Sequence, residues 1–122
     1  MGKSSLVALT LSLSLAGCSL TIPFIMPRAH DPVMFGDAVD IKLLLSNVSC
    51  EEKQYKWETL LEKSDKLKTY TELRKDPQAD NIKGMFEAIG KAKSSTNPYF
   101  CKSVIGLQQK RIDAAIEAWR GR

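Results

Sequence analysis

The sequence predicts an all-α fold, a small antiparallel bundle of about four helices. Two observations lead to this prediction: helix-start signals recur along the chain, and apolar residues recur every three or four positions between them. In three of these signals an Asp or Asn stands directly before a Pro, at Asp31-Pro32, Asp76-Pro77 and Asn97-Pro98. The Asp or Asn oxygen accepts a free backbone N–H at the helix start, and Pro has no N–H to lose there.

A fourth start signal, Ser49-Cys50-Glu51-Glu52, fits a capping box in which Ser49 caps the helix and Glu52 reaches back. The four signals predict helices near residues 32–47, 50–75, 77–93 and 98–120. Each range carries one apolar stripe, which we expect to form the core. The stripes are Met34, Ala38, Ile41, Leu45 and Val48; Trp57, Leu60, Leu61 and Leu67; Ile82, Met85, Phe86 and Ile89; and Cys101, Val104, Ile105, Ile112, Ala115, Ile116 and Trp119.

Three places in these ranges leave a choice open. Residues 39–45, VDIKLLL, also alternate with period two, so a strand is an alternative to a helix there. Gln108 interrupts the last stripe; we expect it to be buried and bonded to a backbone carbonyl or to Tyr70, with a place in a binding groove as the alternative. We expect Tyr99 and Phe100 to lie in the core, and the alternative is an exposed anchor patch.

The N-terminal region has the layout of a secretory signal peptide. Lys3 precedes an apolar run over residues 6–15, which is half the length that a membrane-spanning helix needs. The stretch Leu15-Ala16-Gly17-Cys18 then matches the lipobox of bacterial lipoproteins at all four positions. The chain therefore resembles a bacterial-type lipoprotein precursor over roughly its first 20 residues.

This resemblance implies cleavage before Cys18, attachment of lipid (palmitate among its acyl chains) to the Cys18 thiol, and acylation of the new amino group. Ser19 stands where an Asp would favour the inner membrane, so the family's rule implies the outer membrane, with the body in the periplasm. We therefore divide the chain into a signal peptide (1–17), a lipidated Cys with a Pro-containing tether (18–30) and a helical domain (31–122). A buried helix over residues 6–15 is the alternative.

Charge is unevenly spread along the chain, whose formal net charge is +4. Residues 91–122 hold seven basic and two acidic side chains. We expect a solvated helix face there; a surface for anionic lipid or an acidic partner is the alternative. An exported lipoprotein has little occasion to meet nucleic acid, so we expect no nucleic-acid partner.

Once Cys18 carries lipid, Cys50 and Cys101 remain as an even pair in an oxidising compartment, which predicts a disulfide between them. Both are expected in the first turns of their helices, 50–75 and 98–120. In an up-down-up-down bundle these two helices start at the same end, and their parallel pairing brings the thiols within reach.

The residue types that carry catalysis are scarce. A zinc site needs about four Cys or His ligands, and only Cys50, Cys101 and a lone His30 remain, so we expect no metal and no cofactor. The acidic pair Glu58 and Glu62 lies one helical turn apart among lysines, which is typical of a solvent face. We therefore expect a protein that is not an enzyme and has no catalytic residues.

Two further resemblances concern function. The plan of lipobox, short tether, helices and two cysteines about fifty residues apart is similar to that of small lipoproteins encoded by tailed phages. The stretches Arg74-Lys75-Asp76-Pro77-Gln78, Phe100-Cys101 and Trp119-Arg120 also look like that group, which would imply a role in lysis or superinfection exclusion. Secretin pilotins are likewise small helical lipoproteins with one disulfide.

The sequence favours a lipid-anchored, non-enzymatic helical module that binds an envelope protein. A pilotin-like chaperone and a structural envelope lipoprotein without a defined ligand are the alternatives.

Overall fold

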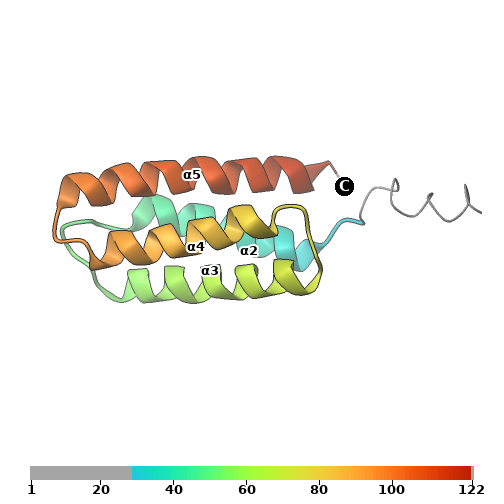
Figure 1. Ribbon diagram of the computed structural model, residues 1–122, viewed down its shortest axis with the longest axis horizontal. Helices are drawn as coiled ribbons and strands as arrows, with labels where there is room; N and C mark the ends of the chain where they lie inside the picture. The colour runs from blue at the N-terminus through green and yellow to red at the C-terminus, as the bar shows by residue number, and fades with distance from the viewer. Residues whose placement is uncertain (1–28, 122) are drawn as a thin grey trace, which may run out of the picture.

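The computed structural model describes residues 29–121, in which four helices follow one another along the chain (Figure 1). They are α2 (Pro32–Asn47), α3 (Tyr55–Leu73), α4 (Ala79–Ser94) and α5 (Pro98–Arg120). Short loops reverse the chain between them, which confirms the predicted antiparallel all-α bundle. The described residues contain no strand, and residues 39–45 belong to α2, so the strand alternative is wrong. The signal peptide and most of the tether lie outside the described residues.

Each helix packs against two neighbours, in the cyclic order α2, α3, α4, α5. The helices α3 and α5 therefore face each other across a diagonal, and the expected direct pairing of these two parallel helices is wrong. One end of the bundle, here called the disulfide end, holds the loops 48–54 and 95–97 (Figure 1). The opposite end, here called the tether end, holds the start of α2, the loop 74–78 and the end of α5.

Two helices begin where their Asx-Pro signals predict. The Asp31 carboxylate accepts the backbone N–H groups of Val33 and Met34, at 3.0 and 3.1 Å, and α2 starts at the next residue, a Pro. The Asn97 side chain caps α5 in the same way, through the first N–H groups after its own Pro. These caps confirm that local side-chain chemistry sets both starts.

The predicted start of the second helix is wrong. Ser49 Oγ does accept the N–H groups of Glu51 and Glu52, as a capping serine would, but α3 begins only at Tyr55. A helix from residue 50 would need the Ser49 carbonyl to accept the N–H of residue 53. That carbonyl instead accepts the indole N–H of Trp57, at 2.8 Å. Cys50 consequently lies in the loop 48–54 and not in a first helical turn.

The predicted start of the third helix is also displaced, from residue 77 to Ala79. Asp76 Oδ1 accepts the N–H of Gln78, at 2.9 Å, and the Asp76 carbonyl accepts the N–H of Ala79. Asp76 Oδ1 also accepts the indole N–H of Trp119 on α5, at 3.1 Å. The buried Asp76 therefore closes a turn and ties it to α5, and α4 begins after that turn.

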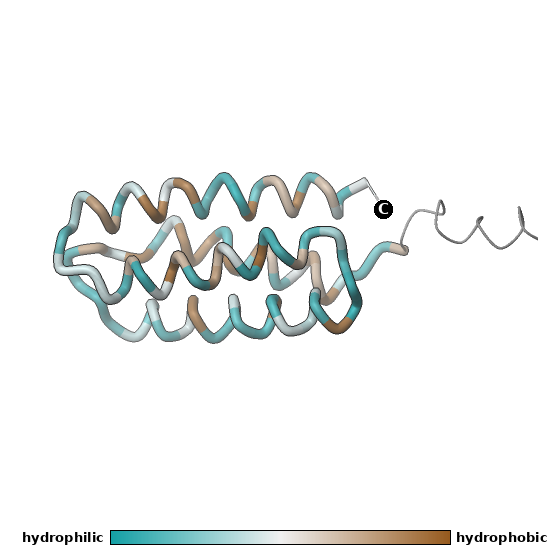
Figure 2. The backbone as a smooth tube through the Cα atoms, in the orientation of Figure 1, coloured by the Kyte–Doolittle hydropathy of each residue, from teal (hydrophilic) through white to brown (hydrophobic). Residues whose placement is uncertain are grey.

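The core is built from the predicted stripes, with buried polar exceptions on α2, α3 and α5. Figure 2 shows hydrophobic positions recurring between hydrophilic ones along the helices, as amphipathic packing requires. On α3 the buried face also includes Ser64 and Thr71, whose hydroxyls donate to the carbonyls of Leu60 and Leu67 one turn earlier. The fully buried large side chains include Trp57, Trp119, Met34, Ile41, Leu45, Leu60, Leu67, Ile82, Met85, Ile89 and Ile112.

Candidate functional site

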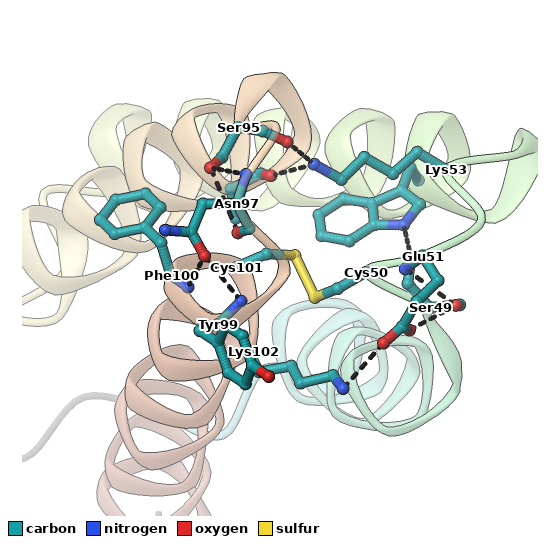
Figure 3. The surroundings of a disulfide bond; sticks show 12 residues. Ser49, Cys50, Glu51, Lys53, Ser95, Asn97, Tyr99, Phe100, Cys101 and Lys102 are labelled. Atoms are coloured by element: carbon teal, nitrogen blue, oxygen red, sulfur yellow. Dashed lines mark hydrogen bonds and ion pairs between the residues drawn. A yellow bond between two sulfur atoms is a disulfide. The ribbon is translucent and has the colours of Figure 1, made fainter.

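The disulfide end is closed by the predicted bond between Cys50 and Cys101, whose Cα atoms are 5.8 Å apart (Figure 3). The bond joins the loop 48–54 to the first turn of α5, so it links a loop to a helix. Cys101 is fully buried on the core face of α5, whereas Cys50 is only partly buried. The bond thus lies at the edge of the core and closes the end of the bundle.

Lys53 fastens the same loop to the end of α4. Its ammonium donates to the carbonyl oxygen of Ala92, at 2.8 Å, and to that of Ser95 (Figure 3). These carbonyls end α4, where a cation complements the helix dipole. The same ammonium lies 5.9 Å from the centroid of the Trp57 ring. The loop is therefore held on three sides: by a disulfide to α5, by a lysine to α4 and by an indole to α3.

An ion pair on the surface adds a further link between this loop and α5. Lys102 Nζ lies 2.7 Å from a carboxylate oxygen of Glu51. The hydrogen bond from Lys102 lowers the pKa of the Glu51 carboxyl, with help from a backbone N–H. Both side chains are more than half exposed, so the pair orients the loop and adds little stability.

Two aromatic side chains stand out on this rigid end, and the expectation that they lie in the core is wrong. Tyr99 is 82% exposed and Phe100 is 47% exposed. The reason is helical phase: the Asn97 cap starts α5 so that Cys101 points inward, and the two preceding residues then point outward. The exposed patch that the sequence left as the alternative is therefore what the structure has.

The apolar surface continues along α5. Phe100, Val104 and Leu107 are spaced as i, i+4 and i+7, so they share one face of the helix. Val104 is partly buried and Leu107 is 55% exposed. Arg111 follows in the same row, and its guanidinium lies over Gly84, where an added Cβ would come within 2.5 Å. This row, the α5 outer stripe (Phe100, Val104 and Leu107), therefore runs along the side of α5 nearest α4.

Gln108 is buried, with 2% of its surface exposed, which confirms the expectation from the sequence that it lies in the core. Its Nε2 donates to the carbonyl of Val104, at 3.0 Å, and its Oε1 has no hydrogen-bond partner. Tyr70, the other partner considered, instead donates to Asp31 at the tether end. Gln108 thus belongs to the core of the bundle and not to a groove.

The tether end is joined by buried carboxylates. Asp31 Oδ2 accepts the Tyr70 hydroxyl at 2.8 Å and pairs with Arg74 at 3.0 Å, which fixes the start of α2 to the end of α3. Burial opposes ionisation of Asp31, but the backbone N–H of Met34, the Tyr70 hydroxyl and the Arg74 charge outweigh it. The pKa of Asp31 consequently lies below its ordinary value.

The site residues named from the sequence separate into two groups. The structure brings Cys50 and Cys101 together in a disulfide, whereas Cys18, the predicted lipid attachment site, lies outside the described residues. His30 is exposed, with its ring centroid 5.7 Å from that of Phe35. Residues 29–121 hold no group of three or more His, Cys, Asp or Glu side chains placed to bind a metal ion.

None of the four described helices is both long and apolar enough to cross a membrane. Comparisons of the chain with models of known protein families, with curated proteins and with solved structures give no match.

Proposed function

We propose that this chain is a lipid-anchored, non-enzymatic helical module that binds an envelope protein through the disulfide end and the α5 outer stripe. The observation that carries the proposal is the exposure of Tyr99 and Phe100 on a firmly held end of the bundle, continued by the exposed Leu107 further along α5. Aromatic and large apolar side chains contribute most of the binding energy at protein interfaces. The surrounding disulfide, lysine and indole contacts keep this surface ordered before binding, which lowers its entropic cost.

The position of the predicted anchor supports the same assignment. The tether joins the bundle at the end opposite to Tyr99, and α5 runs between the two ends (Figure 1). A helix of 23 residues is roughly 35 Å long. With lipid on Cys18, the tether end would face the membrane and the aromatic end would reach into the periplasm, where an envelope protein is accessible.

The anchor is tested by the substitution Cys18→Ser in the full precursor. We expect loss of metabolic labelling with a palmitate analogue and loss of signal-peptide cleavage, because both steps require the thiol. Fractionation of the envelope should then find the wild-type protein, but not the variant, in the outer membrane. Labelling and cleavage that persist in the variant would refute the lipoprotein assignment.

Partner binding is tested by capture from crosslinked envelopes with the intact lipidated protein. We expect the double variant Phe100→Ala/Leu107→Ala to lose a specific partner band that the wild type retains. The matched control is Leu43→Ala, since Leu43 is a comparably exposed leucine (58%) on α2, outside the outer stripe. Equal capture by the wild type and both variants would exclude the α5 outer stripe as the contact surface.

A further inference from the structure

The charges on α3 are paired on one side of the helix and only partly paired on the other. On the side facing α2, Lys63 pairs with Asp40 at 3.0 Å and Lys66 pairs with Asp37 at 3.5 Å. The side facing α4 carries the acids Glu58, Glu62 and Asp65 together with the cation Lys68. Neither the Glu58 nor the Glu62 carboxylate has an ion pair or side-chain hydrogen bond to another described residue. Asp65 and Glu72 share the Lys68 ammonium on the same helix, at 3.9 and 4.0 Å, whereas Glu58 and Glu62 remain without a cation.

These acids surround a depression between α3 and α4 with a volume of about 440 Å³. It is lined by Glu58, Leu61, Glu62 and Asp65 of α3 and by Phe86 and Lys93 of α4. A second depression, of about 540 Å³, shares Phe86 and extends over Glu87, Gly90 and Lys91. It is open at Gly90 because an added Cβ there would meet no atom within 4 Å. This second depression is lined by residues of α4 alone and adjoins the first at Phe86. We call the two depressions together the α3–α4 groove.

The floor of the α3–α4 groove is apolar. Leu61 and Phe86 are partly buried against the core, so each leaves an apolar edge uncovered. The Lys68 ammonium lies 5.4 Å from the centroid of the Phe86 ring, which shows that this ring already accepts a cation on one side. The groove therefore combines an aromatic floor with carboxylates on its α3 rim.

We propose that the α3–α4 groove binds a basic amphipathic helix of a partner protein. Glu58 and Glu62 are one turn apart, about 6 Å along the axis, which matches lysines or arginines at i and i+4 of a partner helix. An apolar side chain between those cations would rest against Phe86. Lys93 on the opposite rim repels a uniformly cationic chain, so the complementary partner is amphipathic and not simply polybasic. The acidic rim also disfavours an anionic membrane as the occupant.

This surface is separate from the one in the proposed function. The α5 outer stripe is apolar and lies on α5, whereas the α3–α4 groove has carboxylates on its α3 rim and lysines on α4. A chain with both surfaces can hold two partners, or two parts of one partner, at the same time. The groove proposal does not depend on the lipid anchor or on the α5 outer stripe, so each can fail alone.

The test uses the mature lipidated protein in uncharged nanodiscs and a synthetic probe. The probe is a fluorescein-labelled 15-residue helical peptide with leucines on one face and lysines at i and i+4 beside them. A matched peptide with glutamates in place of the lysines is the negative probe. Fluorescence anisotropy measures binding of both peptides to the wild type and to three variants.

The first variant, Glu58→Gln/Glu62→Gln, removes two groove charges and should weaken binding of the lysine peptide about tenfold, as expected for two exposed ion pairs. The control, Glu52→Gln/Glu117→Gln, removes the same charge elsewhere and should change binding less than about twofold. The third variant, Gly90→Leu, fills the second depression and should weaken binding at least about fivefold. Replacement of a helical glycine does not lower helix stability, so the bundle should keep its thermal stability.

Three results would overturn the proposal. One is equal weakening by the groove variant and the charge control, which would reveal only general electrostatic attraction. Another is unchanged binding by Gly90→Leu with the fold intact, and the last is no binding of the lysine peptide by the wild type. Retained capture of the envelope partner through the α5 outer stripe would still support the proposed function in each case.

Discussion

Reduction of the bond between Cys50 and Cys101 should destabilise the bundle mainly through its unfolded state. The two cysteines are 51 residues apart in sequence. For a closed loop of that length the chain-entropy relation gives a stabilisation of roughly 4 kcal/mol at 25 °C. In the folded state the loop 48–54 keeps its bonds to Trp57 and from Lys53, so its native position does not depend on the disulfide alone.

The assay is urea denaturation of the chain from residue 19, followed by circular dichroism with and without a reducing agent. We expect the reduced protein to keep its helical spectrum and to lose up to about 4 kcal/mol in unfolding free energy. For a domain of this size that loss corresponds to a fall of about 15–30 °C in Tm.

The matched control is Cys50→Ala/Cys101→Ala, whose stability should not respond to the reducing agent. A difference below about 1 kcal/mol between the oxidised and reduced wild type would refute the loop-closure argument. Loss of the helical spectrum on reduction would show that the bond is needed to hold the native fold itself.

Three more predictions concern single side chains. Because the pKa of Asp31 is lowered on folding, its contribution to stability is present above its ordinary pKa of 3.8 and is lost as pH falls through the lower folded-state pKa. Asp31→Asn should therefore flatten the acid limb of a curve of unfolding free energy against pH. Trp119→Phe removes the hydrogen bond to the buried Asp76 and should cost about 2 kcal/mol in urea unfolding; a loss under 0.5 kcal/mol would contradict it. Gln108→Met removes a buried oxygen without a partner and should raise the unfolding free energy by about 1 kcal/mol, measured in the same way, whereas a loss would show that the amide is needed.

Local signals in the sequence were sufficient to locate two of the helix starts. Asp31 and Asn97 cap their helices because an Asx oxygen needs only the N–H groups two and three residues further on. The 3.6-residue period likewise placed the core faces of α2, α4 and most of α5, since the periodicity belongs to the helix alone. The pairing of Cys50 with Cys101 followed from counting cysteines once Cys18 was assigned to lipid.

The signals failed where a distant residue competes for the same group. Ser49 carries a proper capping pattern, but its carbonyl is taken by the indole of Trp57, so α3 begins six residues later. Asp76 likewise precedes a proline, yet its carboxylate also binds Trp119, 43 residues further along the chain. No local pattern at Ser49 or Asp76 reveals which indole will reach it.

The candidate surfaces depended on the tertiary structure to an even greater degree. The sequence alone determined the helical class and the spacing of Phe100, Val104 and Leu107, and the predicted lipid anchor rests on the sequence resemblance alone. Packing completed the decision that Tyr99 and Phe100 face outward, because the burial of Cys101 and the order of the four helices orient the helix that the Asn97 cap starts. Packing also decided which acids of α3 remain without a cation, since Lys63 and Lys66 pair with aspartates of α2, and Lys68 pairs with Asp65 and Glu72. The part of a helix that stays exposed depends on the helices packed beside it, and their arrangement is set by contacts across the whole bundle.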